Sequence, residues 1–147
     1  MNILVDTNIL LRSVQIHHPQ YTVVETALAV IKAQEKVLCV CIQNLIEFWA
    51  VATRPCGSTN GLGFSTAAAA KELECLKEFF QVLPESNLIL DCWEQLVKGY
   101  GVSGKTTHDA RLVATMKLNG VTQILTFNVQ DFSRFEGIEA IHPESVG

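Results

Sequence analysis

Asp109 is a carboxylate placed where a helix would face the protein core. In the segment 106–120, TTHDARLVATMKLNG, the residues Leu112, Val113 and Met116 recur at three- and four-residue steps, which puts them on one face of a helix. The same spacing puts Asp109 on that apolar face. A buried carboxylate is costly unless it is paired or bound to a metal ion. Asp109 is therefore a candidate for chemistry as well as for the acidic first turn of a helix.

Three further acidic residues have a comparable setting. Asp6 ends the strand-like run NILV, and Asp131 follows the strand-like run TQILTF. Parallel sheets bind ligands beyond the carboxyl ends of their strands, so Asp6, Asp109 and Asp131 can meet at one sheet edge. Glu47 is the fourth candidate, in the apolar segment QNLIEFWAVA. Structural alternatives stand beside these interpretations: a helix cap for Asp6, a turn for Asp131, and a contact with Arg54 for Glu47.

The runs that would position these residues alternate between strand-like and helix-like patterns. We expect strands at 2–5, 37–41, 87–90, 122–127 and 138–142. We expect helices at 7–15, 20–34, 42–54, 67–83, 91–101 and 106–120, and a turn or short helix at 128–135. The helix at 42–54 is apolar on nearly every side, so we expect it to be buried. Strands separated by helices pair in parallel. The sequence therefore predicts an α/β fold, a single domain over residues 1–147 with a parallel sheet of four to five strands flanked by helices.

Composition excludes several classes of protein. The chain has 147 residues, of which 48% are hydrophobic and 18% charged, and its net charge is −4. This acidity argues against a protein that coats nucleic acid non-specifically, but not against a metal-dependent nuclease whose carboxylates are neutralised by cations. No apolar run approaches the length of a membrane helix, and the N-terminus lacks a signal-peptide pattern. We expect a cytoplasmic protein with no membrane association.

The five cysteines are an odd number and contain no C-x-x-C pair. We expect all of them to be reduced. Cys39 and Cys41 alternate in a strand-like run, so they should face the same side of the sheet as small hydrophobic residues.

A glycine-rich segment offers a second interpretation. GYGVSGKT, residues 99–106, formally fits a phosphate loop in which Gly104, Lys105 and Thr106 would bind phosphate. Such a loop needs a strand in front of it, and the element expected here is a helix. We therefore expect an ordinary loop, with a nucleotide hydrolase as the less favoured alternative.

Taken together, the four acidic motifs resemble those of the PIN domain family. ILVDTNILL resembles the family's opening strand and first acidic motif, and NLIEFWAVATRP resembles its second. HDARLVATMKLNGVTQILTFNVQDF resembles the third and fourth motifs in the family's order. The resemblance spans essentially the whole chain, and the short length is most similar to the VapC-type toxins of toxin–antitoxin pairs.

The resemblance implies a ribonuclease that depends on Mg²⁺ or Mn²⁺ and hydrolyses RNA with metal-activated water. The family's acidic positions, catalytic and metal-binding, fall on Asp6, Glu47, Asp109 and Asp131. Asp6 and Asp109 would be the central ligands, while Glu47 and Asp131 would hold a second ion or orient water. The family's polar positions fall on Asn8, Thr126 and Asn128, and Asn128 is an alternative to Asp131 for part of the fourth role.

The partners implied are an RNA substrate, an antitoxin protein and a second copy of the chain. Lys105, Arg12 and Arg54 are candidates for contacts with RNA phosphates, with solvated surface charge as the simpler interpretation of each. Trp93, Phe79 and Phe80 lie on helix faces that one small domain need not cover, so a homodimer is predicted. A PIN-like nuclease of RNA processing without a toxin role, and a catalytically inactive PIN-like interaction scaffold, are the alternatives.

Overall fold

The computed structural model describes residues 1–58 and 60–146, which form a parallel sheet of five strands. The strands are β1 (Asn2–Val5), β2 (Val37–Val40), β3 (Gln81–Val82), β4 (Gln123–Leu125) and β5 (Glu139–Ile141). Their order in the sheet is β3-β2-β1-β4-β5, and every neighbouring pair is parallel. The carboxyl ends of all the strands therefore lie along one edge, and the predicted fold class is confirmed.

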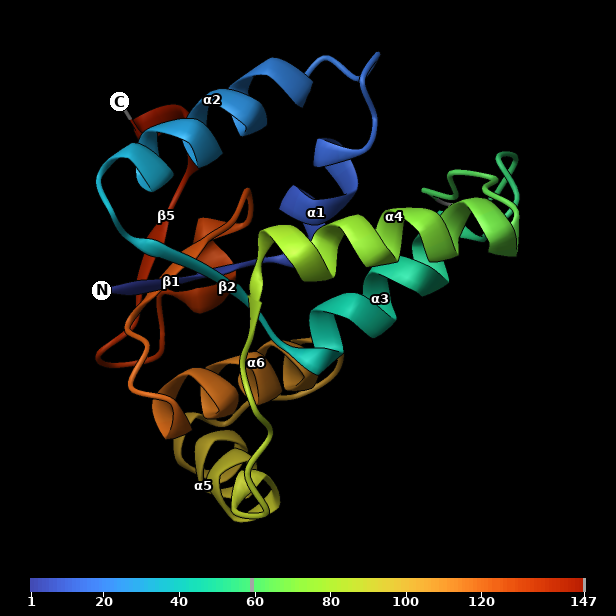
Figure 1. Cartoon of the computed structure of the whole chain (residues 1–147). Coiled ribbons are helices and arrows are strands. Elements are labelled where there is room, and N and C mark those ends of the chain that lie inside the picture. Colours follow the sequence, from blue (N-terminus) through green and yellow to red (C-terminus); the bar gives the residue numbers. More distant parts are fainter. Residues whose placement is uncertain (59, 147) are drawn as a thin grey trace.

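Helices connect the strands and cover both faces of the sheet (Figure 1). They are α1 (Thr7–Ser13), α2 (Tyr21–Ala33), α3 (Ile42–Ala52), α4 (Thr66–Phe79), α5 (Ile89–Tyr100) and α6 (Thr106–Leu118), with short 3-10 helices η1 (Val129–Phe132) and η2 (Pro143–Ser145). In the view of Figure 1, α2 lies above the sheet and α5 and α6 lie below it. Within the described residues, no helix is both long and apolar enough to span a membrane.

Alternation along the strands builds two hydrophobic cores. Ile3 and Val5 of β1 belong to the core that also contains residues of α1, α2, α3 and α4. Leu4, between them, belongs to the core on the other face, with residues of α5 and α6. Successive strand residues point to opposite faces, so a four-residue strand that is buried on both sides serves both cores. Cys39 and Cys41 both join the second core, as the sequence predicts, and both thiols are free.

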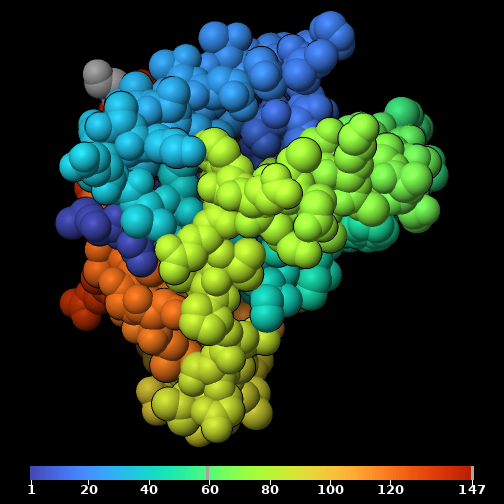
Figure 2. Space-filling view, in the orientation of Figure 1, coloured from blue at the N-terminus to red at the C-terminus, as the bar shows by residue number. Residues whose placement is uncertain are grey.

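The segment between α4 and α5 departs from the prediction in two ways. The helix expected at 67–83 ends at Phe79, and Gln81 and Val82 form the edge strand β3 beside β2. The strand expected at 87–90 is wrong, because α5 already begins at Ile89. A two-residue strand is too short to show an alternating pattern, and the apolar run NLIL suits the start of an amphipathic helix as well as a strand. Figure 2 shows this connecting segment on the surface, between α4 and the lobe formed by α5.

The predicted burial of the helix at 42–54 is only partly correct. Phe48 and Ala52 of α3 are fully buried, whereas Ile42 is 39% exposed and Ile46 is 62% exposed. One face of α3 packs against α1 and α4, and the face with Ile42 and Ile46 is open to solvent. Glu47 lies on the side of α3 that faces α1, where its carboxylate accepts a hydrogen bond from Thr7.

Candidate active site

Asp6 lies where β1 becomes α1, at the point where the strand order of the sheet reverses. The chain continues from β1 to β2 on one side and returns with β4 on the other, which is the position where open α/β sheets bind ligands. Asp6 is the N-cap of α1, and its Oδ1 accepts the Thr7 backbone N–H at 2.8 Å. Its own backbone N–H donates to the Leu125 carbonyl of β4 at 2.9 Å. The capping role considered for Asp6 is therefore real, and it fixes the carboxylate at the sheet edge.

The polar residues predicted around Asp6 gather at the end of β4. The hydroxyl of Thr126, fully buried, donates to Asp6 Oδ2 at 2.7 Å. Thr126 Oγ1 in turn accepts the Asn128 backbone N–H at 3.0 Å and the Asn8 Nδ2 at 3.5 Å. Each Asp6 oxygen thus has one hydrogen bond from the protein and keeps a lone pair free for another partner.

Glu47 reaches the same edge from α3. Its Oε1 accepts the Thr7 hydroxyl at 2.7 Å, and its Oε2 accepts the Gln43 amide Nε2 at 3.2 Å. Among the described residues, the structure pairs Glu47 with no arginine, and Arg54 is exposed. The contact with Arg54 considered from the sequence is therefore wrong, and the polar face of α3 holds Glu47 next to Asp6's own neighbour, Thr7.

Asp109 occupies the first turn of α6, half-buried, at the end of the apolar face predicted for it. Leu112, Val113 and Met116 are buried, so the face does point inward. Burial and, after it, the charges of Asp6, Asp131 and Glu47 together raise the pKa of Asp109 from its ordinary 3.8 to about 7, against the opposing charge of Lys105. An acid in this setting is neutralised either by a proton or by a cation.

Asp6 shows the same electrostatic signature. Burial raises its pKa from 3.8 to about 6, although the hydrogen bonds from Thr126 and Thr7 act in the opposite direction. The charges of Glu47 and Asp131 add to the increase. The charges of Glu47 and Asp131 act on both Asp6 and Asp109, and the charge of Asp6 acts on Asp109. The four carboxylates therefore belong to one electrostatic site.

Asp131 is the most exposed member of this group. It lies in η1, and its backbone N–H donates to the Asn128 carbonyl at 3.0 Å. Its charge raises the pKa of both Asp6 and Asp109, so it contributes to the negative field of the site. The turn expected at 128–135 and a place at the site are thus compatible for this residue.

The donors fit a hydrated divalent cation rather than a fully enclosed one. Among the residues that the structure describes, no three His, Cys, Asp or Glu side chains converge closely enough to surround a metal ion. Mg²⁺ commonly keeps several waters and is held through one or two carboxylates, with the rest of its ligands supplied by substrate phosphate. Asp6 and Asp109, two acids whose pKa values are raised by burial and by neighbouring negative charge, suit that mode of binding.

The remaining sequence candidates lie at or beyond the edge of the site. Lys105 is exposed and acts electrostatically on Asp109. Arg12 donates to the side-chain oxygens of Gln20 at 3.0 Å and Gln15 at 2.8 Å. The glycine-rich segment around Gly104 joins α5 to α6, so within the described residues the element directly before it is a helix and not the strand that a phosphate loop requires.

Sequence reasoning missed the hydrogen-bonding roles of Thr7, Gln43 and Asn44. Thr7 donates to Glu47, Gln43 donates to Glu47 and to the His108 carbonyl, and Asn44 donates to Thr7. The spacing contained a signal, since Gln43 and Asn44 precede Glu47 by four and three residues and such residues share a helix face. The contact of Thr7 with Glu47 joins residues forty positions apart, and no local pattern predicts it.

Comparisons with known proteins agree on the fold. A family model described as PIN domain matches residues 3–138. Comparison with curated protein sequences finds no match. Among solved structures, the chain is similar to VapBC2 from Rickettsia felis, bound to a DNA fragment from its promoter, with a TM-score of 0.71 and 14% identity over 97% of this chain and 98% of that one.

Two further solved structures have the same architecture. VapBC-1 from nontypeable Haemophilus influenzae has a TM-score of 0.70 and 18% identity, covering 99% of this chain and 100% of that one. VapC20 from Mycobacterium tuberculosis, described as a toxin that cleaves the sarcin-ricin loop, has a TM-score of 0.58 and 21% identity, covering 83% and 86%. With the family model matching nearly the whole length, the chain belongs to the PIN domain family.

Proposed function

We propose that the protein is a divalent-metal-dependent endoribonuclease that hydrolyses phosphodiester bonds with water. The observation that carries this proposal is that the charge of Asp6 acts on Asp109 within one group of acids. Burial and the charges of the neighbouring acids raise both pKa values, to about 6 and about 7. Clustered acids that disfavour ionisation are a marker of functional sites, and a divalent cation is the partner that relieves their repulsion.

Each residue of the site has a distinct part in this chemistry. A bound Mg²⁺ or Mn²⁺ supplies activation of water and neutralisation of the phosphodiester charge. Asp6 and Asp109 bind the cation, Thr126 orients Asp6 through its hydroxyl, and Glu47 and Asp131 hold a second ion or orient water. Lys105, exposed beside Asp109, provides a positive charge for the RNA backbone.

We further propose that this activity is that of the toxin in a cytoplasmic toxin–antitoxin pair. The similar structures include a toxin–antitoxin complex from Klebsiella pneumoniae, with a TM-score of 0.65, besides the VapBC proteins. The VapC20 toxin, described as cleaving the sarcin-ricin loop, supports RNA as the substrate class. The partners that follow are RNA, an antitoxin protein and a second copy of the chain.

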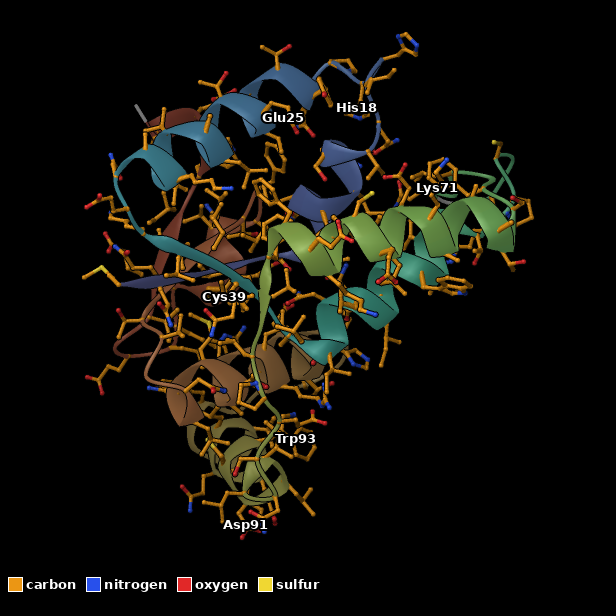
Figure 3. All side chains as sticks on the ribbon, viewed as in Figure 1. His18, Glu25, Cys39, Lys71, Asp91 and Trp93 are labelled. Atoms are coloured by element: carbon orange, nitrogen blue, oxygen red, sulfur yellow. The ribbon has the colours of Figure 1, made fainter. Side chains whose placement is uncertain are left out.

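Cleavage of RNA by the purified protein tests the activity. Mg²⁺ or Mn²⁺ should support cleavage and EDTA should stop it, with products that carry a 5′-phosphate and a 3′-hydroxyl. Asp91→Asn is a matched control, because Asp91 lies on the exposed outer side of α5 (Figure 3) and should tolerate the change. Products that end in a 2′,3′-cyclic phosphate would rule out hydrolysis by metal-activated water.

The neighbouring gene separates the toxin from its alternatives. A small DNA-binding protein encoded directly upstream that forms a complex with this chain and inhibits cleavage favours the toxin. Cleavage without such a partner favours a nuclease of RNA processing. Failure to bind Mn²⁺ in equilibrium dialysis favours an inactive scaffold, and nucleotide binding that is lost in Lys105→Ala but kept in Asp6→Asn favours a phosphate-binding hydrolase.

A further inference from the structure

We propose that Thr7, Gln43 and Asn44 are positioning residues that fix the direction of the Glu47 carboxylate toward the metal ion. This inference rests on the proposed function and deepens it, since it assigns residues that hold a proposed ligand rather than bind the ion themselves. Two chains of hydrogen bonds, one ending on each oxygen of Glu47, carry the inference. In each chain the direction of the last donor is set by another residue.

The first chain starts at the backbone of Cys41. The side-chain oxygen Oδ1 of Asn44 accepts the Cys41 backbone N–H at 2.9 Å and the Cys41 thiol at 3.1 Å. A backbone N–H can only donate, so this contact assigns the oxygen and the nitrogen of the Asn44 amide. The nitrogen Nδ2 then faces Thr7 Oγ1, to which it donates at 3.2 Å.

Asn44 thereby sets the direction of the Thr7 hydroxyl. Because Thr7 Oγ1 accepts from Asn44, its own proton is free to point at Glu47 Oε1, which lies 2.7 Å away. Asn44 is 0% exposed and Thr7 is 9% exposed, so water does not compete for these groups. Buried polar groups that are fully satisfied hold one geometry firmly.

The second chain starts at Arg111 of α6. Arg111 Nη1 donates to Gln43 Oε1 at 3.0 Å, and a second guanidinium nitrogen of Arg111 pairs with Glu85. An arginine can only donate, so Gln43 Oε1 is assigned and Gln43 Nε2 faces the opposite way. That nitrogen donates to Glu47 Oε2 at 3.2 Å and to the His108 carbonyl at 2.8 Å.

The two chains together fix Glu47 relative to Asp109. Gln43, 7% exposed, joins α3 to the residue that directly precedes Asp109 in the first turn of α6. Gln43 therefore links Glu47 of α3 to the backbone of His108, the residue next to Asp109 in α6. Side chains that hold metal ligands in place typically change metal affinity or activity by about 10-fold to 100-fold when they are replaced.

Metal affinity is the first test. Isothermal titration with Mn²⁺ should show Thr7→Val binding about 10-fold or more weaker than wild type, because valine keeps the shape and loses the donor. Thr7→Ser restores the hydroxyl and should restore wild-type affinity. The control is Thr115→Val, which removes another buried hydroxyl, one that donates to the Arg111 carbonyl within α6, and which should keep wild-type affinity. Equal weakening in Thr7→Val and Thr7→Ser, or wild-type affinity in Thr7→Val, would overturn the proposal.

A metal-free crystal structure of Asn44→Asp is the second test. The new carboxylate still accepts from Cys41 but cannot donate to Thr7, so the Thr7 hydroxyl should turn toward it and release Glu47 Oε1. The distance between Thr7 Oγ1 and Glu47 Oε1 should therefore lengthen from 2.7 Å, and an unchanged distance would overturn the inference whatever the protein does to RNA. Absence of Mn²⁺ binding by the wild-type protein, with the Thr7 hydroxyl turned as expected in the variant, would instead overturn the proposed function.

Discussion

At the residue scale, the site depends on acids that the fold makes reluctant to ionise. Asp109 has a pKa of about 7, raised by burial and by the charges of the other acids. When ionised and without a cation, such a residue lowers the free energy of unfolding of the protein, because its charge is buried and repelled by the other acids. Replacement of its charge should therefore affect activity and metal-free stability in opposite directions.

Asp109→Asn tests this expectation. The substitution keeps size and polarity, so the metal-free variant should melt at or above the wild-type temperature because one repelling charge is gone. Cleavage should fall to the level seen with EDTA, and the increase in melting temperature caused by Mn²⁺ should shrink. Thermal melts with and without Mn²⁺ beside a cleavage assay measure all three effects, with Asp91→Asn as the control. Retained cleavage in Asp109→Asn would show that Asp109 is only a first-turn helix residue.

The raised pKa values also predict how stability depends on pH. Asp6 and Asp109 have folded-state pKa values of about 6 and about 7, above the ordinary 3.8. Between those values the folded protein binds more protons than the unfolded chain, so the free energy of unfolding should fall as the pH rises from about 4 to 7. The contribution of half-buried Asp109 is smaller than its raised pKa alone would give, because solvent partly screens the charges around it.

Urea denaturation without metal, at pH values from about 5 to 8, measures this dependence. Adding Mn²⁺ should restore stability mainly at the higher pH, where both acids are ionised and free to bind the ion. A metal-free stability that rises steadily with pH across this range would contradict the assignment of raised pKa values.

At the element scale, the sequence predicted those helices and strands whose positions are determined by hydrophobic periodicity and by capping residues. The helix from Thr106 and the strands around Asp6 and Thr126 lie where expected, because each has a run long enough to show its period. The edge strand Gln81–Val82 has two residues, and a run of that length shows no period. The contacts of Glu47 could not be predicted from the sequence either, because Thr7 is distant from it in the sequence and becomes its neighbour only in the folded structure.

The end of α5 offers a prediction from a matched pair of glycines. Gly101 is the C-cap of α5 with φ +64°, whereas Gly99 lies within the helix, and a Cβ at either position would meet no atom within 4 Å. Gly101→Ala should cost roughly 1 kcal/mol through left-handed backbone strain, lowering the melting temperature by about 2–4 °C. Gly99→Ala should stabilise by roughly 0.5–1 kcal/mol, because alanine favours the helix.

Thermal melts of the two variants measure this difference, and RNA cleavage should be unchanged in both because neither glycine contacts the site. Equal shifts in the same direction would contradict the left-handed cap as the reason for glycine at position 101.

At the scale of the whole molecule, the residues that suggested a homodimer are not all exposed. Phe80 is 4% exposed and belongs to the core, so it cannot form an interface. Trp93 lies half-buried between α5 and α6, and its indole N–H donates to the Thr107 carbonyl at 2.9 Å. Phe79, 45% exposed, packs under the Lys32 ammonium at 4.5 Å from the ring centroid. These aromatic residues therefore do not form a dimer surface together, and the start of α5 is the better candidate for one.

The start of α5 exposes a group of apolar side chains that a second copy could cover. Leu88 is 56% exposed and Leu90 is 63% exposed, beside a cleft of about 290 Å³ lined by Ile89, Leu90, Trp93 and Arg111. Large exposed apolar groups that cluster next to a cleft are typical of partner surfaces. Light scattering at micromolar protein should therefore give the mass of a dimer.

Leu90→Asp should convert that dimer to a monomer, because a buried carboxylate without a partner opposes association. Ile16→Asp is the matched control, since Ile16 is also 63% exposed but lies in the connection after α1. The control should remain a dimer, and both variants should stay folded, as a cooperative thermal melt of each would show. A wild-type monomer, or equal dissociation by both substitutions, would show that this surface does not hold two copies together. In that case the exposed leucines remain available to an antitoxin, and complex formation with the upstream gene product should be the step that Leu90→Asp prevents.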